Sequence, residues 1–466
     1  MLGRTILLTV MAVSELAVAS GEIDKTINGF DKVEKSSKKL LKHFHEPFCM
    51  CNRSPLFSEH KYDEKVHGYT RVHHIFSGKD NGFDKNTGST LGFELKYDTH
   101  LTERLYGGVE YYGVTDTGLT DKDKNIAFGQ FMSEDKNSNQ EYGDSWGVHL
   151  AYIDNAFKTV VARSQFDSPL TKMQITHVPN LFEYARVDAE VSDVDLSLAY
   201  ITKIAYGSRS AADFGLIGEK TGTAGMVSSP FKDIKRGDYY SISDVVGNKN
   251  ADGVLVLGAK KTFDNFRVEA WNFNVKDTLN NLYVEMEYPF YSSKGYAAGL
   301  HMQYLNQNVE SDYDDKYGGD LYGVKLSTKI KKLKVNFAYN KKDDKGGFLN
   351  PSGANPGYTS SIFSRNEYRS DVTAFKVSAM YPLTKGIKLI ASYADYGESD
   401  MTLNRGASKP ALESQTDAKE SNIILVYKPI KNLTFKLFNA NRTSEFSTAT
   451  KERKQNHTRV IANYAF

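Results

Sequence analysis

Segments of about ten residues, in which apolar and polar side chains alternate, recur along this chain. In one example Leu91, Phe93 and Leu95 alternate with small or charged residues, and Tyr97 follows at the end of the run. Successive strand side chains point to opposite faces, so each segment is apolar on one side and mostly polar on the other. The same pattern occurs at 146–152, 282–288, 296–304, 373–381 and 423–427. A tilted strand of this length crosses a bilayer with aromatic residues near its ends, so the repeat predicts a transmembrane β-barrel.

A single alternating segment would fit a soluble β-sandwich better than a membrane barrel, because sandwich strands alternate in the same way. Many segments that share aromatic ends reverse this preference. The mean hydropathy is −0.49, as expected when half of each barrel strand faces water. The chain has 29 Tyr and 26 Phe but only 2 Trp, so an aromatic girdle would consist mainly of Tyr and Phe. The formal net charge of +2 argues against nucleic acid as a partner.

Short turns and long polar stretches separate the predicted strands. Eight short turns imply about 18 strands, with 16 as the alternative count, and the first strand is expected at 66–76. The fold class is therefore all-β, a transmembrane antiparallel β-barrel wide enough to enclose water. The short turns are expected at 99–104, 153–156, 192–193, 264–265, 289–295, 331–333, 382–386 and 429–432. The long polar stretches are 116–143, 207–251, 306–319, 342–371, 398–419 and 443–455.

The N-terminal part differs in kind from the barrel. Residues 1–19 combine a basic start, an apolar stretch and an A-x-A site, which indicates a secretory signal peptide. Residues 20–65 are rich in lysine and predict an N-terminal periplasmic extension, with a pore-plugging role as the alternative. Cys49 and Cys51 fall in this extension and lack the second half of a metal site. The barrel itself is assigned to 66–466.

The last strand carries a second signal. From Thr458 to Phe466 one face is mostly apolar and the other mostly polar, and an aromatic residue ends the chain. This resembles the final strand of bacterial outer-membrane barrels. The resemblance implies that Tyr464 and Phe466 form part of the signal read by the barrel-assembly machinery.

A segment near 164–181 is too apolar for a loop exposed to water. It contains two prolines together with Leu170, Met173 and Ile175. Folding into the lumen would bury these side chains against the wall, so we expect an inward-folded third loop. Arg163 and Arg186 flank the loop and would line the narrowing. The alternative for each arginine is a rim charge paired with a neighbouring carboxylate, because barrel lumens carry charges of both signs.

The same region resembles the strand and third loop of the OprD-type porins. A basic residue and a glutamine close a strand, then D-S-P-L follows, and P-N-L-F-E precedes the next strand. The resemblance implies an 18-stranded channel, monomeric to trimeric, with a basic ladder that guides anionic solutes. The matching positions are Arg163, Gln165, Asp167, Ser168, Pro169, Leu170, Pro179, Asn180, Phe182 and Glu183.

One departure concerns the loop itself, which carries Lys172 and His177 in place of an arginine cluster. Substrate preference therefore does not transfer from the family to this chain. The candidate constriction residues are Arg163, Gln165, Asp167, Lys172, His177, Glu183 and Arg186.

Other patterns point away from catalysis. The histidines are scattered, no serine pairs with them at a recognisable spacing, and the glycine-rich fragments lack the context of a phosphate loop. We expect no enzyme activity, no cofactor and no metal site.

The sequence favours an outer-membrane porin of a Gram-negative bacterium that passes small hydrophilic solutes and ions by diffusion. A preference for carboxylate-bearing solutes is a further expectation. The expected partners are these solutes, outer-membrane lipid and lipopolysaccharide, and the barrel-assembly machinery, with a homotrimer among the assemblies considered. The alternative is a surface adhesin or structural barrel whose pore is closed.

Overall fold

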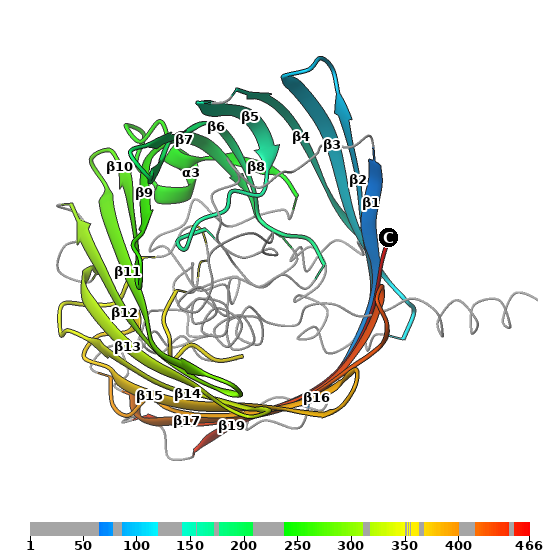
Figure 1. Cartoon of the computed structure of the whole chain (residues 1–466), viewed down its shortest axis with the longest axis vertical. Helices are drawn as coiled ribbons and strands as arrows, with labels where there is room; N and C mark the ends of the chain where they lie inside the picture. The colour runs from blue at the N-terminus through cyan, green and yellow to red at the C-terminus, as the bar shows by residue number, and fades with distance from the viewer. Residues whose placement is uncertain are drawn as a thin grey trace, which may run out of the picture.

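The computed structural model describes one closed sheet of antiparallel strands (Figure 1). The residues described are 65–77, 86–119, 142–154, 156–171, 177–207, 237–310, 317–349, 352, 354, 356–362, 368–399, 415–446 and 452–466. The predicted signal peptide, almost all of the predicted extension and both cysteines lie outside these residues, and their assignments stay predictions. In the described part of the chain, no helix is both long enough and apolar enough to cross a membrane.

The sheet consists of 19 strands, and a single short helix, α3, lies between β8 and β9 in the described part of the chain. The elements are β1 (Lys65–Ser77), β2 (Asn86–His100), β3 (Leu105–Asp116), β4 (Tyr142–Ile153), β5 (Phe157–Ser164), β6 (Leu181–Val191), β7 (Val194–Ala205), β8 (Tyr239–Ser241), α3 (Ile242–Val246), β9 (Val254–Thr262), β10 (Arg267–Val275), β11 (Leu279–Ser293), β12 (Tyr296–Val309), β13 (Gly319–Ile330), β14 (Leu333–Lys342), β15 (Thr373–Thr384), β16 (Ile387–Asp395), β17 (Gln415–Ile430), β18 (Leu433–Phe446) and β19 (Arg453–Ala465).

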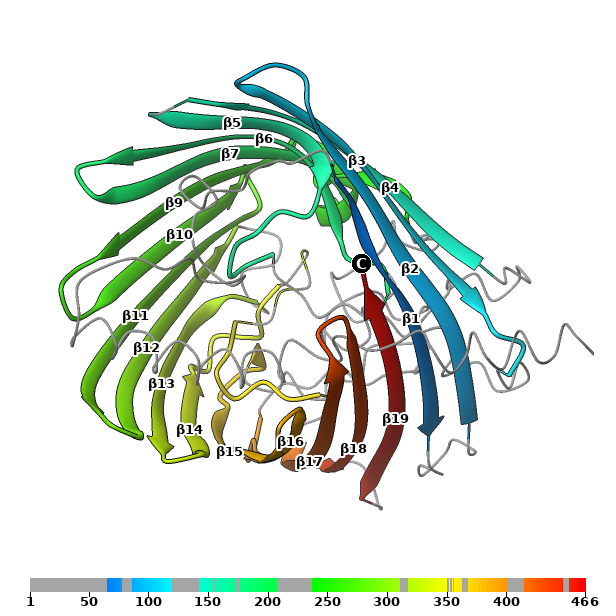
Figure 2. The same ribbon diagram turned by 45° about the vertical axis from the view of Figure 1, so that its right-hand side comes forward.

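Eighteen of these strands form the wall, which confirms the predicted count. The exception is β8, a three-residue strand that pairs with the end of β7 beyond the stretch that pairs with β9. The ring closes where β19 runs antiparallel to β1, with Tyr69 opposite Ala465. Figure 2 shows this seam, where the last strand lies beside the first.

The eight predicted short turns all join consecutive strands at one rim. Ser192 and Asp193 form a two-residue turn with φ values of 51° and 62°, which suits the right-handed twist of a hairpin. At the opposite rim the connections are mostly long. The β10–β11 connection is short there, with Asp277 at φ 51°, and the sequence analysis did not identify it.

Side chains on the wall alternate between an apolar outer face and a lumen face, as predicted. Trp146, Val161 and Ile423 are 62%, 59% and 61% exposed on the outer surface. Between them on the same strands lie buried polar residues such as Ser145 and Asn422. The outer face suits hydrocarbon and the inner face suits water, which is the pattern of a membrane barrel.

The seam also positions the chain end. The Phe466 N–H donates to the Gly68 carbonyl at 3.0 Å, and the Gly68 N–H donates to the Phe466 carbonyl at 3.1 Å. The Phe466 side chain is 45% exposed on the outer side, as the alternation predicts. Recognition of Tyr464 and Phe466 by an assembly machinery stays a prediction.

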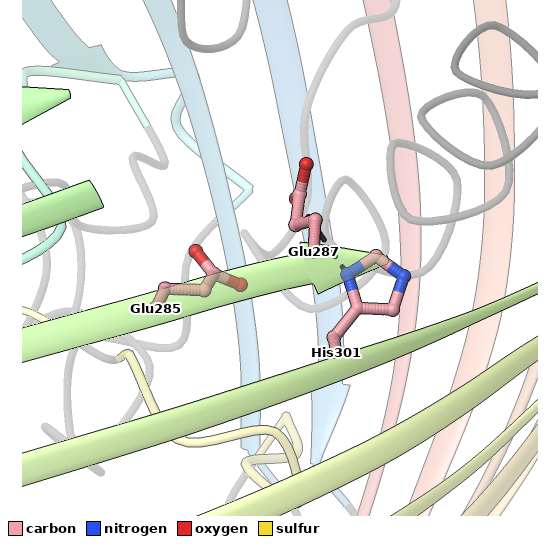
Figure 3. Close-up of side chains that lie close together, drawn as sticks. All are labelled: Glu285, Glu287 and His301. Atoms are coloured by element: carbon pink, nitrogen blue, oxygen red, sulfur yellow. Dashed lines mark ion pairs between the residues drawn. The ribbon is translucent and has the colours of Figure 1, made fainter. Parts of the chain in front are cut away.

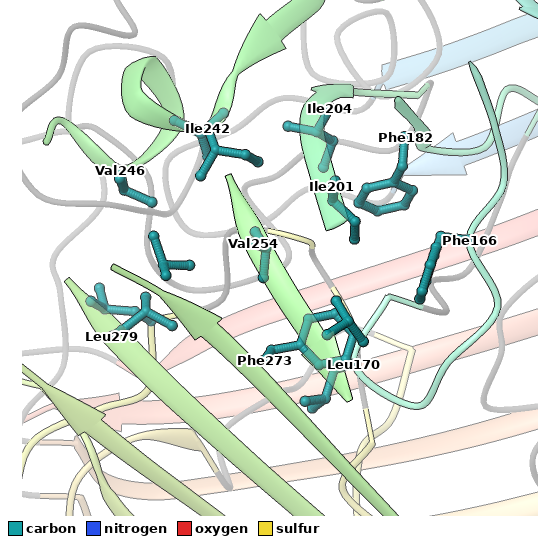
Figure 4. Close-up of a cluster of buried hydrophobic side chains, with 14 of the residues drawn as sticks. Phe166, Leu170, Phe182, Ile201, Ile204, Ile242, Val246, Val254, Phe273 and Leu279 are labelled. Atoms are coloured by element: carbon teal, nitrogen blue, oxygen red, sulfur yellow. The ribbon is translucent and has the colours of Figure 1, made fainter. Parts of the chain in front are cut away.

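A large apolar cluster lies inside the barrel and fixes the inward segments (Figure 4). It joins wall residues such as Phe182 and Phe273 to Phe166 and Leu170 of the β5–β6 loop and to Ile242 of α3. Burial of this apolar surface, at roughly 25 cal/mol per Å², anchors the loop to the wall.

Candidate functional site

The β5–β6 loop folds into the lumen, as predicted. Phe166 and Leu170 are 3% and 6% exposed, and the Phe166 ring packs edge-on against Tyr184 and Phe273 at 5.0 and 6.3 Å between centroids. Inside the loop, Thr171 donates its hydroxyl to the Phe166 carbonyl at 2.5 Å. The apolar side chains Phe166 and Leu170 are therefore buried against the wall and not exposed to solvent.

A second loop, between β14 and β15, also enters the lumen, although its sequence was assigned to a polar stretch at the rim. The Tyr358 N–H donates to Gln303 Oε1 of β12 at 2.9 Å, and the Thr359 N–H donates to Asn340 Oδ1 of β14 at 2.9 Å. Lys376 of β15 donates to the Ser360 carbonyl. Asn340 and Ser360 are fully buried. Polar wall side chains thus bind the loop backbone, which satisfies it away from water.

The two inward loops meet. The Ser352 hydroxyl donates to the Leu170 carbonyl, and Asn180 Nδ2 donates to the Ser352 carbonyl at 3.0 Å. Figure 2 shows both segments within the ring of strands. Together they narrow the passage from opposite walls. The same signals that identified the first loop, prolines with apolar side chains, are present in the second as Pro356, Tyr358 and Ile362 and could have identified it.

Arg186 lies beside Asp167 of the inward β5–β6 loop. Arg186 faces the lumen from β6, and its Nε donates to Asp188 Oδ1 at 2.7 Å while Nη2 donates to the Ser197 hydroxyl at 3.1 Å. Its guanidinium lies 5.1 Å from the Phe166 ring centroid, and Nη1 is 3.4 Å from the Asp167 carbonyl oxygen. Arg186 and Asp188 are 7% and 1% exposed, so this ion pair mainly anchors the loop and is largely shielded from passing solute.

Arg163 and Glu183 lie together on a different face. Arg163 is opposite Val148 in the ladder and shares its face with Val161, and both valines are exposed on the outer surface. The Arg163 Nε donates to Glu183 Oε2 at 2.7 Å, and Lys203 Nζ lies 3.2 Å from Glu183 Oε1. The Glu183 carboxylate thus accepts hydrogen bonds from Thr202, Arg163 and Lys203. This arrangement corresponds to the rim pairing that the sequence left open as the alternative.

His177 and Gln165 connect the loop to the wall near the seam. His177 is fully buried, with Nε2 2.7 Å from the Thr90 hydroxyl, and the Tyr69 hydroxyl donates to its carbonyl. Burial holds the pKa of His177 well below its ordinary value, with the positive charge of Arg71 acting in the same direction. Gln165 Nε2 donates to the Tyr112 hydroxyl at 3.0 Å.

Glycine on β2 makes room for this histidine. A Cβ on Gly92 would lie 2.1 Å from His177 Nδ1, so any side chain there would displace the loop. Lys172, the remaining predicted constriction residue, lies outside the described residues.

The lumen wall carries charge of opposite sign on two arcs. The acidic arc comprises the inward carboxylates of β2 to β11, and the basic arc comprises the inward Lys and Arg side chains of β13 to β19 and β1. The acidic arc contains Glu94, Asp98, Glu110, Asp188, Glu269, Glu285 and Glu287. The basic arc contains Lys325, Lys334, Lys342, Lys376, Lys436, Arg442, Arg459 and Arg71. On the strands of the basic arc, as far as they are described, the inward-facing carboxylate is Glu420 alone.

Comparisons with known proteins agree on the fold. No protein-family model matches the sequence, and no curated protein matches it. Solved structures match across most of the chain. OccAB4 from Acinetobacter baumannii superposes with a TM-score of 0.65 at 13% identity, covering 87% of this chain and 99% of that one. OccK9 (OpdG) from Pseudomonas aeruginosa gives 0.65 at 14% identity, with 86% and 98% covered.

A third match is OpdK from Pseudomonas aeruginosa, solved with vanillate, with a TM-score of 0.63 at 12% identity and coverage of 86% and 98%. OpdK is described as an outer membrane protein. The chain therefore has the closed 18-stranded fold of these solved structures, as its resemblance to the OprD-type porins predicts.

Proposed function

We propose that this protein is an outer-membrane channel through which small hydrophilic solutes and ions pass by diffusion. The observation that carries the proposal is the meeting of two inward loops, through Ser352 and Leu170, inside a closed barrel. A structural barrel or adhesin needs no backbone folded into its lumen, whereas a selective channel needs a narrowing there. The polar wall on both sides of the narrowing supplies a wetted route.

We further propose that the channel favours solutes that bear a carboxylate. The basic arc runs along one wall of the lumen, and the low-dielectric barrel concentrates its field in the aqueous space. Fixed guanidinium and ammonium groups attract a carboxylate without the tight contact that would trap it. Vanillate, bound by OpdK, is an aromatic carboxylate. Ring surfaces near the narrowing, such as Tyr358, suit a solute of that kind.

Liposome swelling and planar-bilayer recording test both parts of the proposal. Purified, folded protein should give discrete conductance steps, and liposomes that contain it should admit benzoate faster than benzamide, which has the same shape without the charge. Replacing Arg71 by Gln should reduce this preference. If folded barrels gave no conductance steps, the channel proposal would fail and a structural barrel with a closed pore would remain as the interpretation. Equal rates for benzoate and benzamide would remove the carboxylate preference but keep the channel.

The exposed apolar outer face supports placement in an outer membrane, with lipopolysaccharide as neighbour at one rim. Phe466, at the end of the closing strand, is proposed as the contact for the assembly machinery. Its deletion should lower the amount of folded barrel in outer-membrane fractions several-fold. Wild-type amounts would contradict that role.

A further inference from the structure

Three side chains with metal-binding chemistry converge on the lumen wall. Glu285 and Glu287 project from β11, and His301 projects from the adjacent strand β12, directly opposite Glu287 in the ladder (Figure 3). One ligand atom of each residue lies within 4.8 Å of those of the other two. The three residues are 7%, 5% and 2% exposed, so the site is shielded from bulk water.

The histidine is the part of this cluster that the rest of the fold does not explain. Within the described residues neither ring nitrogen of His301 makes a hydrogen bond. Its Nδ1 faces Glu287 Oε1 at 3.6 Å, which is beyond hydrogen-bonding distance. Burying an imidazole without partners costs free energy, and such a group calls for an explanation such as a missing ion. A metal ion between Nδ1 and the carboxylates would supply the partner.

The surrounding charges leave room for a cation. Glu269 lies directly opposite Glu285, and like charges in that position repel each other. Arg267 lies 3.0 Å from Glu287 Oε2 and 3.6 Å from Glu269 Oε2. It therefore engages one oxygen of Glu287 and leaves the other facing His301. Lys325 lies opposite His301 on β13, so among the described strand residues at these positions three carboxylates face the two cations Arg267 and Lys325.

The second inward loop covers the cluster. The Tyr358 hydroxyl donates to Glu285 Oε1 at 2.8 Å, and its ring lies 6.5 Å from the His301 ring. Lys325 Nζ lies 4.4 Å from the centroid of the same ring, which draws that ammonium group toward the aromatic face. The hydrogen bond from the Tyr358 hydroxyl would orient the Glu285 carboxylate. Hydrogen-bond partners of ligating groups raise metal affinity in this way.

We propose that Glu285, Glu287 and His301 bind a divalent transition-metal ion on the lumen wall. One imidazole and two carboxylates suit borderline ions such as Zn²⁺, whereas Mg²⁺ and Ca²⁺ prefer oxygen ligands alone. Small rotations of the three side chains would bring their ligand atoms to the roughly 2.0–2.2 Å that Zn²⁺ requires. Three protein ligands leave a coordination position for water or for an anionic solute. The site needs only the folded barrel, so it goes beyond the proposed transport and does not depend on it.

Zn²⁺ titration of folded, chelator-stripped protein in detergent tests the site. The wild type should bind Zn²⁺, and Glu285→Gln, Glu287→Gln and His301→Asn should each weaken binding by at least about tenfold, as even outer partners of metal ligands do. The matched control is His149→Asn, which changes another lumen histidine, one that lies 3.2 Å from the Asp98 carboxylate. That variant should bind as the wild type does.

Folded barrels are identified by their heat-modifiable migration on a gel. If one ligand variant fails to fold, the other two variants still test the site. Wild type without measurable Zn²⁺ binding, or ligand variants that bind like wild type, would overturn the proposal. Binding of Mg²⁺ or Ca²⁺ in preference to Zn²⁺, unchanged in His301→Asn, would also overturn it, because the histidine would then have no part. Equilibrium binding does not require an open pore, so failure here is distinct from failure of the channel proposal.

Discussion

The two arcs of the lumen wall use charge in different ways. On the acidic arc the cations lie close to carboxylates on neighbouring positions: Lys96 is 2.9 and 3.1 Å from Glu94 and Glu110, and Arg186 is 2.7 Å from Asp188. On the basic arc Lys342 also pairs with a carboxylate, that of Asp343, whereas other cations contact neutral groups. Arg71 donates to Asn463 at 3.1 Å, and Arg459 lies 5.3 Å from the Phe438 ring centroid.

This difference separates structure from transport. When an adjacent carboxylate neutralises a cation, the ion pair contributes to packing. The carboxylate also cancels much of the field of the cation at a distance. On the described strands of the basic arc, inward cations outnumber inward carboxylates, and this excess positive charge gives a field that a passing anion can experience. Substitutions on the basic arc should therefore change ion selectivity more than substitutions on the acidic arc do.

The largest stability effect is expected at Arg186. Its replacement by Ala leaves the Asp188 carboxylate buried without its guanidinium, and breaking such a pair costs about 3–5 kcal/mol. Urea unfolding of the barrel should report this loss, and the double variant Arg186→Ala/Asp188→Ala should recover part of it. A single variant as stable as wild type would mean that the pair is hydrated and not structural.

The largest selectivity effect is expected at Arg71 and Arg459. Changing both to Gln removes two charges, each worth about 0.5 kcal/mol to an anion roughly 8 Å away in water, so the anion-to-cation permeability ratio should fall about fivefold. Because Arg71 is 2% exposed and donates to Asn463, the free energy of unfolding should also fall, so selectivity is compared only among variants that fold. The matched control is Lys96→Gln on the acidic arc, which should alter selectivity less. Equal shifts from both arcs would break the distinction between them.

A pH effect is expected at the loop anchor His177. Its folded pKa lies well below the ordinary 6.5, so between these values the unfolded chain binds a proton that the folded chain does not. Stability should therefore fall as pH decreases below about 6.5, and the loop should detach more often, visible as added current noise. His177→Gln should weaken the dependence, while His100→Gln, at the exposed end of β2, should leave it as in the wild type. An unchanged profile in His177→Gln would assign the pH effect elsewhere.

The smallest effect is expected at Arg163. The side chain is 46% exposed and paired with Glu183, and exposed pairs contribute about 0–1 kcal/mol. Arg163→Ala should leave ion selectivity within error and stability nearly unchanged. A clear loss of anion preference would return Arg163 to the pore constriction, where the sequence first suggested it.

The wall was predictable because each strand repeats one physical requirement, apolar toward lipid and polar toward water. That requirement located the short turns of one rim and the strand near Val66, but not the short β10–β11 connection at the other rim. The same reasoning could have separated the two arginines: Arg163 is two residues from Val161 and shares its outward face, whereas Arg186 shares the inward face of Tyr184. The alternation within each strand determines whether a side chain faces inward or outward, even where the resemblance of the loop to the family does not.

The lumen interior was less predictable. Contacts such as Ser352 with Leu170 or Tyr358 with Glu285 join positions 182 and 73 residues apart, and no local pattern encodes them. The cluster of Glu285, Glu287 and His301 depends on cross-strand register, which places His301 opposite Glu287 only once the β11–β12 hairpin is known. Motif searches along the chain do not find ligands arranged across a sheet.

The reversal potential of the wild-type channel under a salt gradient tests the central claim most directly, because its sign reports the field that ions meet in the lumen. With the basic arc acting at the narrowing, the folded channel should be anion-selective. The selectivity should move toward cations in Arg71→Gln/Arg459→Gln. A cation-selective wild type, or a double variant with an unchanged potential, would contradict the account.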